Sequence, residues 1–293
     1  MAAHVRPYSG MPSLLAVEVF EPPTVRVLSG GSVRVTVLIP AKNEEGNIGW
    51  VLRRMPLSVD EVVLVDGNST DRTIEIARAI RPDIVVIGEP ARGKGAAMRA
   101  GFAVARGAFV VVMDADGSMD PEDVDAYVGA LEAGADLVKG SRYLRGGGSS
   151  DLTGVRSLGN RALLLLSNVI YRQNFSELCY GFFALRASRI EELALAATGF
   201  EIETEVVCRA VRQGLCIREI PSNEAPRISG QSNLHPVRDG VRIMRTMLRA
   251  AVTTPVRSAR HELALQMPSL VDVDIRGAET GLMPPRPEVL TSD

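Results

Sequence analysis

The residues with the clearest chemical potential in this sequence are two aspartates separated by a single alanine. Asp114 and Asp116 follow directly after the apolar run 108–113. Two carboxylates at this spacing converge where the chain turns, and their hard oxygens suit Mg²⁺ or Mn²⁺, which take their other ligands from water and phosphate. A metal held there would neutralise the charge on a departing diphosphate. A solvated turn is the alternative, because Asp120 and Pro121 are typical of a helix start.

Two earlier apolar runs also end in polar residues. Pro40 closes the first and is followed by Asn43 and Glu44, and Asp66 closes the second. At strand ends these side chains are placed to meet a nucleotide, and Asp66 can accept hydrogen bonds from a base or a ribose hydroxyl. Each also has a simpler explanation, because Asn43 is a good helix cap and an acidic residue near a helix N-terminus contributes about 0.3–1 kcal/mol.

A basic, glycine-rich loop follows the third apolar run. The segment 88–95 reads GEPARGKG, which is similar to a phosphate-binding P-loop but one residue short of it. A P-loop needs Ser or Thr after its lysine as a Mg²⁺ ligand, and Gly95 has no side-chain oxygen. We therefore interpret the loop as a basic segment whose Arg92 or Lys94 reaches a pyrophosphate. A P-loop-like nucleotide hydrolase is the alternative from another class.

The elements that must position these residues alternate along the chain. Four apolar runs alternate with four helical patterns, the runs at 33–40, 60–66, 83–88 and 108–113 and the helices at 47–55, 71–80, 95–105 and 121–133. This alternation predicts an α/β fold with a parallel sheet covered on both faces, and ligands bind such sheets outside the carboxyl ends of the strands. After residue 141 we predict a helix at 159–172, a strand at 178–185 and a helix at 199–210. We expect these elements to complete the sheet and to form the side of the site where a second substrate, the acceptor, would bind.

In their order and spacing these motifs resemble the family 2 glycosyltransferases, and they are most similar to the polyprenol-phosphate sugar transferases of that family. The resemblance covers about residues 33–249 and rests on the motifs IPAKNEE (39–45), VDGNSTD (65–71), ARGKGAAMRAG (91–101), DADGSMDP (114–121), KGSRY (139–143), YGFFALR (180–186), GFEIETE (199–205) and APRISGQSN (225–233). It implies the GT-A fold, a three-layer α/β sandwich with a mostly parallel central sheet. It also implies an inverting, metal-dependent transfer of a hexose from a UDP- or GDP-sugar, with polyprenyl phosphate as the favoured acceptor and a small soluble acceptor as the alternative.

The resemblance further implies roles for individual residues. Those implied to bind the nucleotide-sugar are Pro40, Asn43, Glu44, Asp66, Lys94, Asp114 and Ser141. Metal binding is implied for Asp114 and Asp116, catalysis for Asp116, Arg142 and Glu205, and contact with an anionic acceptor for Arg142, Arg186 and Arg227. A phosphate acceptor needs no general base, whereas an alcohol acceptor needs one from the segment 201–205. There Glu201 and Glu205 share a helix face, and Glu203 points elsewhere.

The sequence departs from the family pattern in ways that bear on both substrates. Asp66-Gly67 stands where two aspartates are common, which bears on recognition of the base. Tyr180-Gly181-Phe182-Phe183 stands where the lipid-phosphate members often carry Ser-Gly-Phe-Arg, and Asn233 follows Ser232 where a lysine is usual. Two positive charges that would favour an anionic acceptor are therefore missing.

Residues 236–260 form a basic segment with helical periodicity. Six arginines stand against one acid, Asp239, and an apolar stripe runs beside a basic one, the first made of Val237, Val241, Met244, Leu248 and Ala251 and the second of Arg238, Arg242, Arg245 and Arg249. A basic amphipathic helix suits the surface of an anionic bilayer. The alternative is a helix packed on the domain with a solvated arginine face.

The bulk composition narrows the remaining possibilities. The 293 residues are 46% hydrophobic and 23% charged, which is typical of a soluble domain, and a net charge of −2 gives no sign of nucleic-acid binding. The three cysteines lack metal-site spacing, and no apolar run is long enough to span a bilayer. We expect a cytoplasmic protein, with peripheral attachment to the inner face of the cell membrane and homo-oligomer formation as further options. The expected organisation is a flexible leader at 1–32, a GT-A catalytic domain at 33–235, the basic helix at 236–260 and a flexible tail at 261–293.

Overall fold

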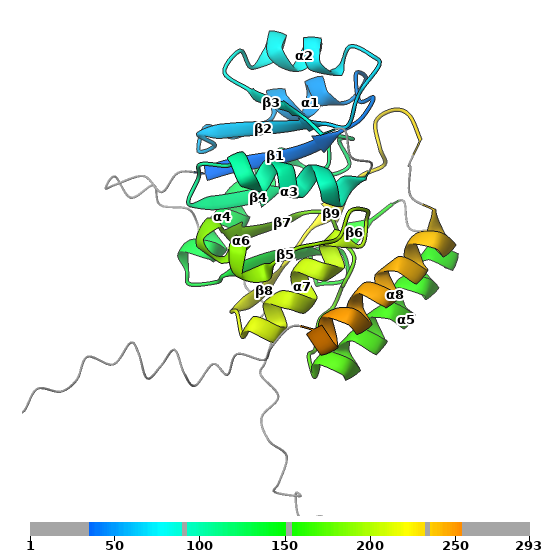
Figure 1. Ribbon diagram of the computed structural model, residues 1–293. Helices are drawn as coiled ribbons and strands as arrows, with labels where there is room; N and C mark the ends of the chain where they lie inside the picture. The colour runs from blue at the N-terminus through cyan, green and yellow to red at the C-terminus, as the bar shows by residue number, and fades with distance from the viewer. Residues whose placement is uncertain (1–34, 90–92, 151–153, 232–234, 254–293) are drawn as a thin grey trace, which may run out of the picture. The chain divides into compact units, whose positions relative to one another are not determined.

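The computed structural model describes residues 35–89, 93–150, 154–231 and 235–253. The expected leader at 1–32 and tail at 261–293 lie outside the described residues. Within the described part, the central element is a seven-stranded sheet of order β3-β2-β1-β4-β7-β5-β8 (Figure 1). Its strands are β1 (Val35–Ala41), β2 (Glu61–Asp66), β3 (Val85–Gly88), β4 (Phe109–Val112), β5 (Leu137–Ser141), β7 (Phe183–Arg186) and β8 (Ile217–Pro221).

The strand pairing makes this sheet mostly parallel, as the sequence predicts. β1 pairs in parallel with β2 and β4, β2 with β3, and β5 with β8. β7 lies between β4 and β5 and runs antiparallel to both. A second sheet pairs two short strands, β6 (Gly148–Ser149) and β9 (Asn223–Glu224).

Helices cover both faces of the sheet, which confirms the three-layer α/β architecture. One face packs against α1 (Ile48–Arg53), α2 (Thr73–Ile80) and α4 (Val124–Glu132), the last preceded by a short 3₁₀ turn, η1 (Pro121–Asp123). The other face packs against α3 (Lys94–Val104), α6 (Ala187–Leu193) and α7 (Ile202–Gln213). Successive residues of β1 alternate between the two cores, with Val37 and Ile39 in one and Leu38 in the other. A strand buried on both faces therefore reads as a continuous apolar run.

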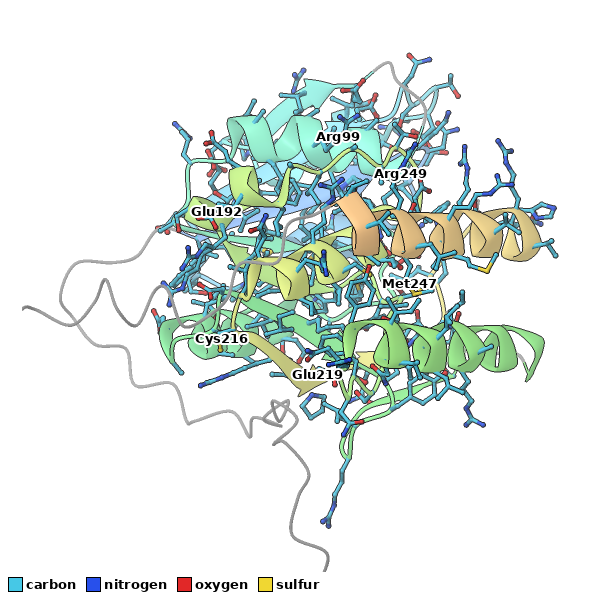
Figure 2. The ribbon with its side chains drawn as sticks, turned by 60° about the horizontal axis from the view of Figure 1, so that its bottom comes forward. Arg99, Glu192, Cys216, Glu219, Met247 and Arg249 are labelled. Atoms are coloured by element: carbon cyan, nitrogen blue, oxygen red, sulfur yellow. The ribbon has the colours of Figure 1, made fainter. Side chains whose placement is uncertain are left out.

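Two long helices lie side by side on the outside of α7. They are α5 (Gly154–Tyr171) and α8 (Pro236–Thr253), and Figure 2 shows them running alongside one another. The hydroxyl of Tyr171 donates to the carbonyl oxygen of Met247 at 2.6 Å, which ties the two helices together. α8 packs on the domain through Ile243, Met247 and Ala250, which are buried. Among the described residues, no helix is long and apolar enough to cross a bilayer.

The sequence prediction missed or misplaced several elements of the second half. The strands β5 and β8 and the helix α6 were not predicted, the strand expected at 178–185 is limited to Phe183–Arg186, and α5 begins five residues earlier than expected. β5 and β8 do not read as apolar runs, because each contains a charged residue, Lys139 and Glu219. These two side chains pair with each other at 2.7 Å inside the protein. Both side chains are only 2% exposed. A buried ion pair removes the apolar signal from both strands at once.

Candidate active site

The polar residues that follow β1 and β2 meet at the carboxyl edge of the sheet. Pro40 lies beyond the ladder with β4, which ends at Leu38, so its missing N–H costs no hydrogen bond on that side. Asp66 ends β2, and one of its carboxylate oxygens accepts from the backbone N–H of Ser69 at 3.0 Å. The other oxygen is buried and has no hydrogen-bond partner among the described residues. A buried carboxylate oxygen without a hydrogen bond destabilises the folded protein. Asp66 is therefore a good candidate to accept a hydrogen bond from a ligand.

Asn43 and Glu44 lie beside Asp66 but differ in what their side chains contact. Asn43 has a φ of 56°, and its side-chain oxygen accepts from the N–H of Thr70 at 2.8 Å, so it braces the two loops. The Glu44 carboxylate accepts from the side-chain amide of Asn47 and pairs with Arg227. Burial raises the pKa of Glu44 above its ordinary value, although both partners oppose the change.

Asp114 is part of a three-membered ionic cluster. The Nζ atom of Lys94, at the first position of α3, lies 2.5 Å from an Asp114 oxygen and 2.6 Å from a Glu203 oxygen. Burial alone would lower the pKa of Lys94, but the two carboxylates outweigh burial and raise it. Burial raises the pKa of Asp114 to about 6, with the charges of Asp116 and Glu203 adding to it and Lys94 opposing it.

Asp116 has a different set of contacts from Asp114. One of its oxygens accepts from the backbone and the hydroxyl of Ser118, at 3.0 and 2.7 Å. The other lies 3.3 Å from an Arg227 nitrogen. Within the described residues there is no group of three histidine, cysteine or acidic side chains arranged to hold a metal ion. Two aspartates with further ligands from phosphate and water are nevertheless a usual Mg²⁺ arrangement, so the residues present fit such an ion only together with a substrate.

A segment between β9 and α8 lies across this edge of the sheet. We call residues 225–231 the strap. The backbone N–H of Ile228 donates to the carbonyl oxygen of Asp116 at 3.2 Å, and Ser229 exchanges two hydrogen bonds with Asn47. The strap thereby places Arg227 between Asp116 and Glu44. Arg227 therefore contacts the carboxylates that follow β1 and β4, and its contact with an acceptor stays a prediction.

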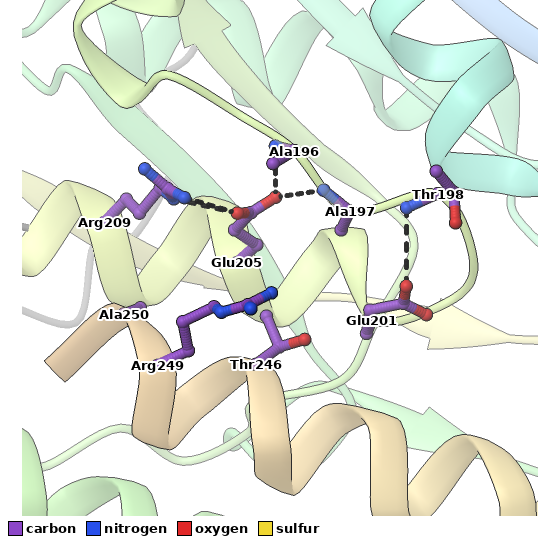
Figure 3. Close-up of a pocket in the computed structure, with 9 residues that line it drawn as sticks. All are labelled: Ala196, Ala197, Thr198, Glu201, Glu205, Arg209, Thr246, Arg249 and Ala250. Atoms are coloured by element: carbon purple, nitrogen blue, oxygen red, sulfur yellow. Dashed lines mark hydrogen bonds and ion pairs between the residues drawn. The ribbon is translucent and has the colours of Figure 1, made fainter. Parts of the chain in front are cut away.

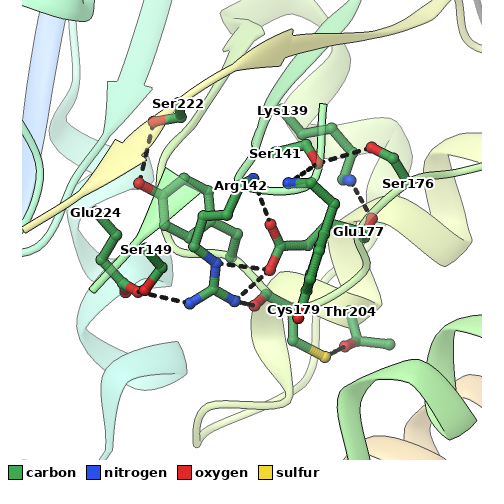
Figure 4. A network of polar contacts seen from close by, with 12 residues as sticks. Lys139, Ser141, Arg142, Ser149, Ser176, Glu177, Cys179, Thr204, Ser222 and Glu224 are labelled. Atoms are coloured by element: carbon green, nitrogen blue, oxygen red, sulfur yellow. Dashed lines mark hydrogen bonds and ion pairs between the residues drawn. The ribbon is translucent and has the colours of Figure 1, made fainter. Parts of the chain in front are cut away.

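Arg142 and Ser141 lie at the end of β5 in a dense polar network, drawn in Figure 4. The Arg142 side chain is only 7% exposed, and its guanidinium pairs with Glu177 and, at 2.7 Å, with Glu224. Burial alone would lower the pKa of Arg142, but Glu177 and Glu224 outweigh it and raise it. Ser141 is buried and accepts a hydrogen bond from the hydroxyl of Ser176 at 2.7 Å. Arg142 therefore holds the structure together in this state, and an acceptor phosphate would have to displace a glutamate to reach it.

Arg186 does not lie where the acceptor role requires. β7 is antiparallel to β4, and Arg186 at its end is paired with Phe109 at the beginning of β4. It therefore lies at the amino edge of the sheet, and its guanidinium donates to the carbonyl oxygens of Leu131 and Ala135. This position and these contacts give no support to the predicted contact of Arg186 with an acceptor.

Of the glutamates at the start of α7, Glu203 joins the ionic cluster and Glu205 contacts other groups. Figure 3 shows the Glu205 carboxylate accepting from the backbone N–H groups of Ala196 and Ala197 and pairing with Arg209, beside a cavity of about 240 Å³. Glu203 instead reaches Lys94. The spacing of the glutamates separates Glu203 from the other two, but it does not tell which face of α7 meets the site. That depends on how α7 packs against α3.

The family model and the curated relatives that match this chain all point to one protein family. A family model described as glycosyl transferase family 2 matches residues 36–193. The dolichol-phosphate mannosyltransferase of Pyrococcus furiosus is 30% identical over 211 residues, 69% of this chain and 59% of that protein. The polyprenol monophosphomannose synthase of Mycolicibacterium smegmatis is 30% identical over 232 residues, 73% of this chain and 84% of that protein.

Solved structures agree with this match. The glucosyl-3-phosphoglycerate synthase of Mycobacterium tuberculosis, crystallised with Mn²⁺, UDP and glucosyl-3-phosphoglycerate, superposes with a TM-score of 0.59 and 25% identity over 74% of this chain and 80% of that chain. The same enzyme with Mg²⁺ and UDP gives a TM-score of 0.59 and 26% identity, over 74% of this chain and 79% of that chain.

Proposed function

This chain belongs to glycosyl transferase family 2, and on that basis we propose that it transfers a hexose from a nucleotide diphosphate sugar to polyprenyl phosphate. The observation that carries the proposal is the meeting of Asp66, Asp114 and Asp116 at one edge of the sheet, each with a buried or ion-paired carboxylate. With the family known, the P-loop-like hydrolase is no longer a useful alternative.

For the donor half of the site, we propose that Asp66 accepts from the nucleoside and that Asp114 and Asp116 hold Mg²⁺ or Mn²⁺. The ion would neutralise the charge on the leaving diphosphate. The unpaired buried oxygen of Asp66 supports the first assignment. The complexes of glucosyl-3-phosphoglycerate synthase with UDP and either metal support the second. Lys94 and Arg227 are the cations nearest to the aspartates in the described chain, and both would face the diphosphate.

For the acceptor half, we propose that a lipid chain approaches between α5 and the end of β5. A cavity of about 170 Å³ opens there, and its lining includes Leu164, Leu178 and Tyr143. Ser176, which also lines it, bonds to Ser141. An acceptor phosphate is already anionic, so direct displacement at the anomeric carbon with inversion needs no general base. A small soluble acceptor, as in glucosyl-3-phosphoglycerate synthase, is the second candidate.

We also propose that the outer side of α5 and α8 rests on a membrane surface. Apolar side chains of both helices are exposed, among them Leu165 and Val169 of α5 and Val237, Val241 and Leu248 of α8. The only acid in α8, Asp239, is buried and accepts from the backbone N–H of His235. The exposed face therefore combines apolar groups with arginines, which suits an anionic bilayer and a lipid acceptor. This would make the protein peripheral on the inner face of the cell membrane.

Calorimetry and a turnover assay test the reaction. UDP or GDP should bind in the presence of Mn²⁺, and Asp116→Ala should abolish the metal-dependent part of that binding. Hexose should then be transferred from the matching nucleotide-sugar to polyprenyl phosphate. Tight ATP binding without a response to UDP or GDP would refute the donor assignment. Transfer to phosphorylated soluble acceptors alone would refute the lipid acceptor and leave the donor assignment standing.

A further inference from the structure

Asp114 and Asp116, the aspartates proposed to bind the metal, each form an ion pair with a basic side chain. Each of these basic side chains also pairs with a glutamate. Lys94 lies between Asp114 and Glu203, with nitrogen–oxygen distances of 2.5 and 2.6 Å. Arg227 lies between Asp116, at 3.3 Å, and Glu44. Both arrangements use the loop after β4, and their other members come from different parts of the chain, α3 and α7 in the first and the strap and the loop after β1 in the second.

The shared cations cannot simply leave when a metal ion binds. The side chain of Lys94 is 8% exposed and that of Glu203 is 11% exposed. A buried charge without a partner is strongly disfavoured, and removing one member of a buried pair typically costs several kcal/mol. A divalent ion on Asp114 and Asp116 therefore requires that each displaced cation keep another carboxylate. Glu203 and Glu44 are the carboxylates already in contact.

We propose that Glu203 and Glu44 are positioning residues for metal entry, each retaining its cation when the metal takes the neighbouring aspartate. The inference rests on the proposed function only in assuming that a divalent ion binds Asp114 and Asp116. If the glutamate is removed, the basic side chain keeps only the aspartate as an acidic partner and competes with the metal for it more strongly. If the glutamate is present, the basic side chain can leave the aspartate and still remain paired within the site.

The surroundings hold both glutamates in place for this task. The backbone N–H of Glu44 donates to the hydroxyl of Thr73 at 2.8 Å, and its carboxylate accepts from Asn47 at 2.5 Å. Glu203 stands in the first turn of α7, whose start is fixed by the hydrogen bonds of Glu201 and Glu205 to the preceding loop. A fixed carboxylate can hold a cation in one position, whereas a flexible one would let it follow the aspartate.

The test is the binding of Mn²⁺, measured by electron paramagnetic resonance on the full-length protein with saturating UDP or GDP, because the two aspartates fit the ion only together with phosphate oxygens. Glu203→Gln and Glu44→Gln keep the shape of the side chain and remove its charge. Each should weaken Mn²⁺ binding about tenfold, the effect of about one hydrogen bond between charged groups. Removing the competing cation should reverse the loss, so Glu203→Gln/Lys94→Met and Glu44→Gln/Arg227→Met should bind Mn²⁺ at least as well as the wild type.

A matched control separates this effect from simple loss of negative charge. Glu45 is exposed, adjoins Glu44 and accepts from the backbone of Arg72. Glu45→Gln should change Mn²⁺ binding by less than about twofold, because exposed charges are well screened. If Glu203→Gln fails to fold, the Glu44 and Arg227 variants test the same relationship at the pair whose cation is more exposed.

The possible outcomes separate the inference from the proposed function. Double variants that stay as weak as the single ones would mean that the glutamates are themselves metal ligands, and this would overturn the inference. Glutamate variants with wild-type Mn²⁺ affinity would overturn it too. Failure of the wild type to bind either Mn²⁺ or a nucleotide diphosphate would instead refute the proposed function, and with it the premise of the inference.

Discussion

Gly181 lies directly against the ammonium group of Lys94. A Cβ atom at Gly181 would lie 2.7 Å from the Lys94 Nζ, 2.8 Å from an Asp114 oxygen and 3.1 Å from a Glu203 oxygen. Cβ atoms essentially never approach other heavy atoms within 3.0 Å, so the Lys94 ammonium and the Asp114 carboxylate would have to shift. The absence of a side chain at this position therefore leaves the space in which the three charges meet.

Gly181→Ala should disrupt that ionic cluster. We expect a loss of about 10²-fold in kcat/KM, the size typical of an ångström-scale displacement in an active site, together with weaker Mn²⁺ binding. Gly129→Ala is the matched control, since a Cβ there meets nothing within 4 Å and an alanine favours the helix by about 0.5–1 kcal/mol. Equal activity of the two variants would contradict the role of Gly181.

The donor half of the site could be predicted from the sequence because of how parallel strands are arranged. β1, β2 and β4 are buried on both faces and read as apolar runs, and their carboxyl ends meet at one edge. Asp66, Asp114 and Asp116 follow those ends, so their convergence required no knowledge of the rest of the chain. Lys94 was also predicted for the site, although the structure adds its pairing with Asp114 and Glu203.

The second half of the fold was harder to predict for two physical reasons. Lys139 and Glu219 interrupt the apolar pattern of β5 and β8, and their mutual neutralisation is visible only in three dimensions. The direction of β7 is also not encoded locally, since a short apolar strand reads the same in either direction. The resemblance implies Arg186 only as a cation for an anionic acceptor, and the strand direction that places it at the amino edge of the sheet becomes visible only in the fold.

Lys139→Met should show how much the protein depends on its buried ion pair. The variant leaves the Glu219 charge buried without Lys139, and we expect a loss of about 3–5 kcal/mol in the free energy of unfolding. Lys139→Met/Glu219→Met removes both charges and should recover part of the loss, measured by urea denaturation. A double variant less stable than the single one would contradict this and show that Glu219 stabilises the protein through its other contacts, the backbone N–H groups of Ser176 and Glu177.

Arg186→Gln should lower stability without affecting substrate binding. The side chain donates to two carbonyl oxygens near the end of α4, and losing these bonds should cost about 1–3 kcal/mol. The KM values for donor and acceptor should stay at wild-type levels in initial-rate assays. If Arg186→Gln raised the KM for the acceptor and left the free energy of unfolding unchanged, Arg186 would have to contact the acceptor after all.

Membrane binding should depend on the charge of α8. Arg238→Glu/Arg245→Glu should reduce co-sedimentation with vesicles containing anionic lipid several-fold, because each basic residue near such a surface contributes about 1 kcal/mol. The control Arg78→Glu/Arg99→Glu makes the same charge change at exposed positions of α2 and α3. Equal partitioning of the two double variants, or of wild type between anionic and neutral vesicles, would refute the membrane proposal.

Asp123 should make stability depend on pH in an unusual direction. Burial, with the charges of Asp120 and Glu122, raises the pKa of Asp123 from 3.8 to about 6. The folded state therefore holds this proton more tightly than the unfolded state, so the contribution of Asp123 is full below pH 3.8 and is lost as the pH rises through about 6. Asp123→Asn should gain stability relative to wild type between pH 4 and pH 7 in denaturation experiments. A difference that stays constant or shrinks over that range would contradict the prediction.

The position of β7 has a consequence for how the protein is made. β4 pairs with β1 on one side and with β7 on the other, and β5 pairs with β7 and β8. As the chain leaves the ribosome, β1 to β4 can assemble early, but β4 remains an open edge until Phe183–Arg186 has been synthesised. An unpaired strand edge can form hydrogen bonds with strands of other chains, which leads to aggregation. Asp114 and Asp116 follow β4, so a ribosome that stalls within α5 leaves both aspartates beside an unpaired strand edge.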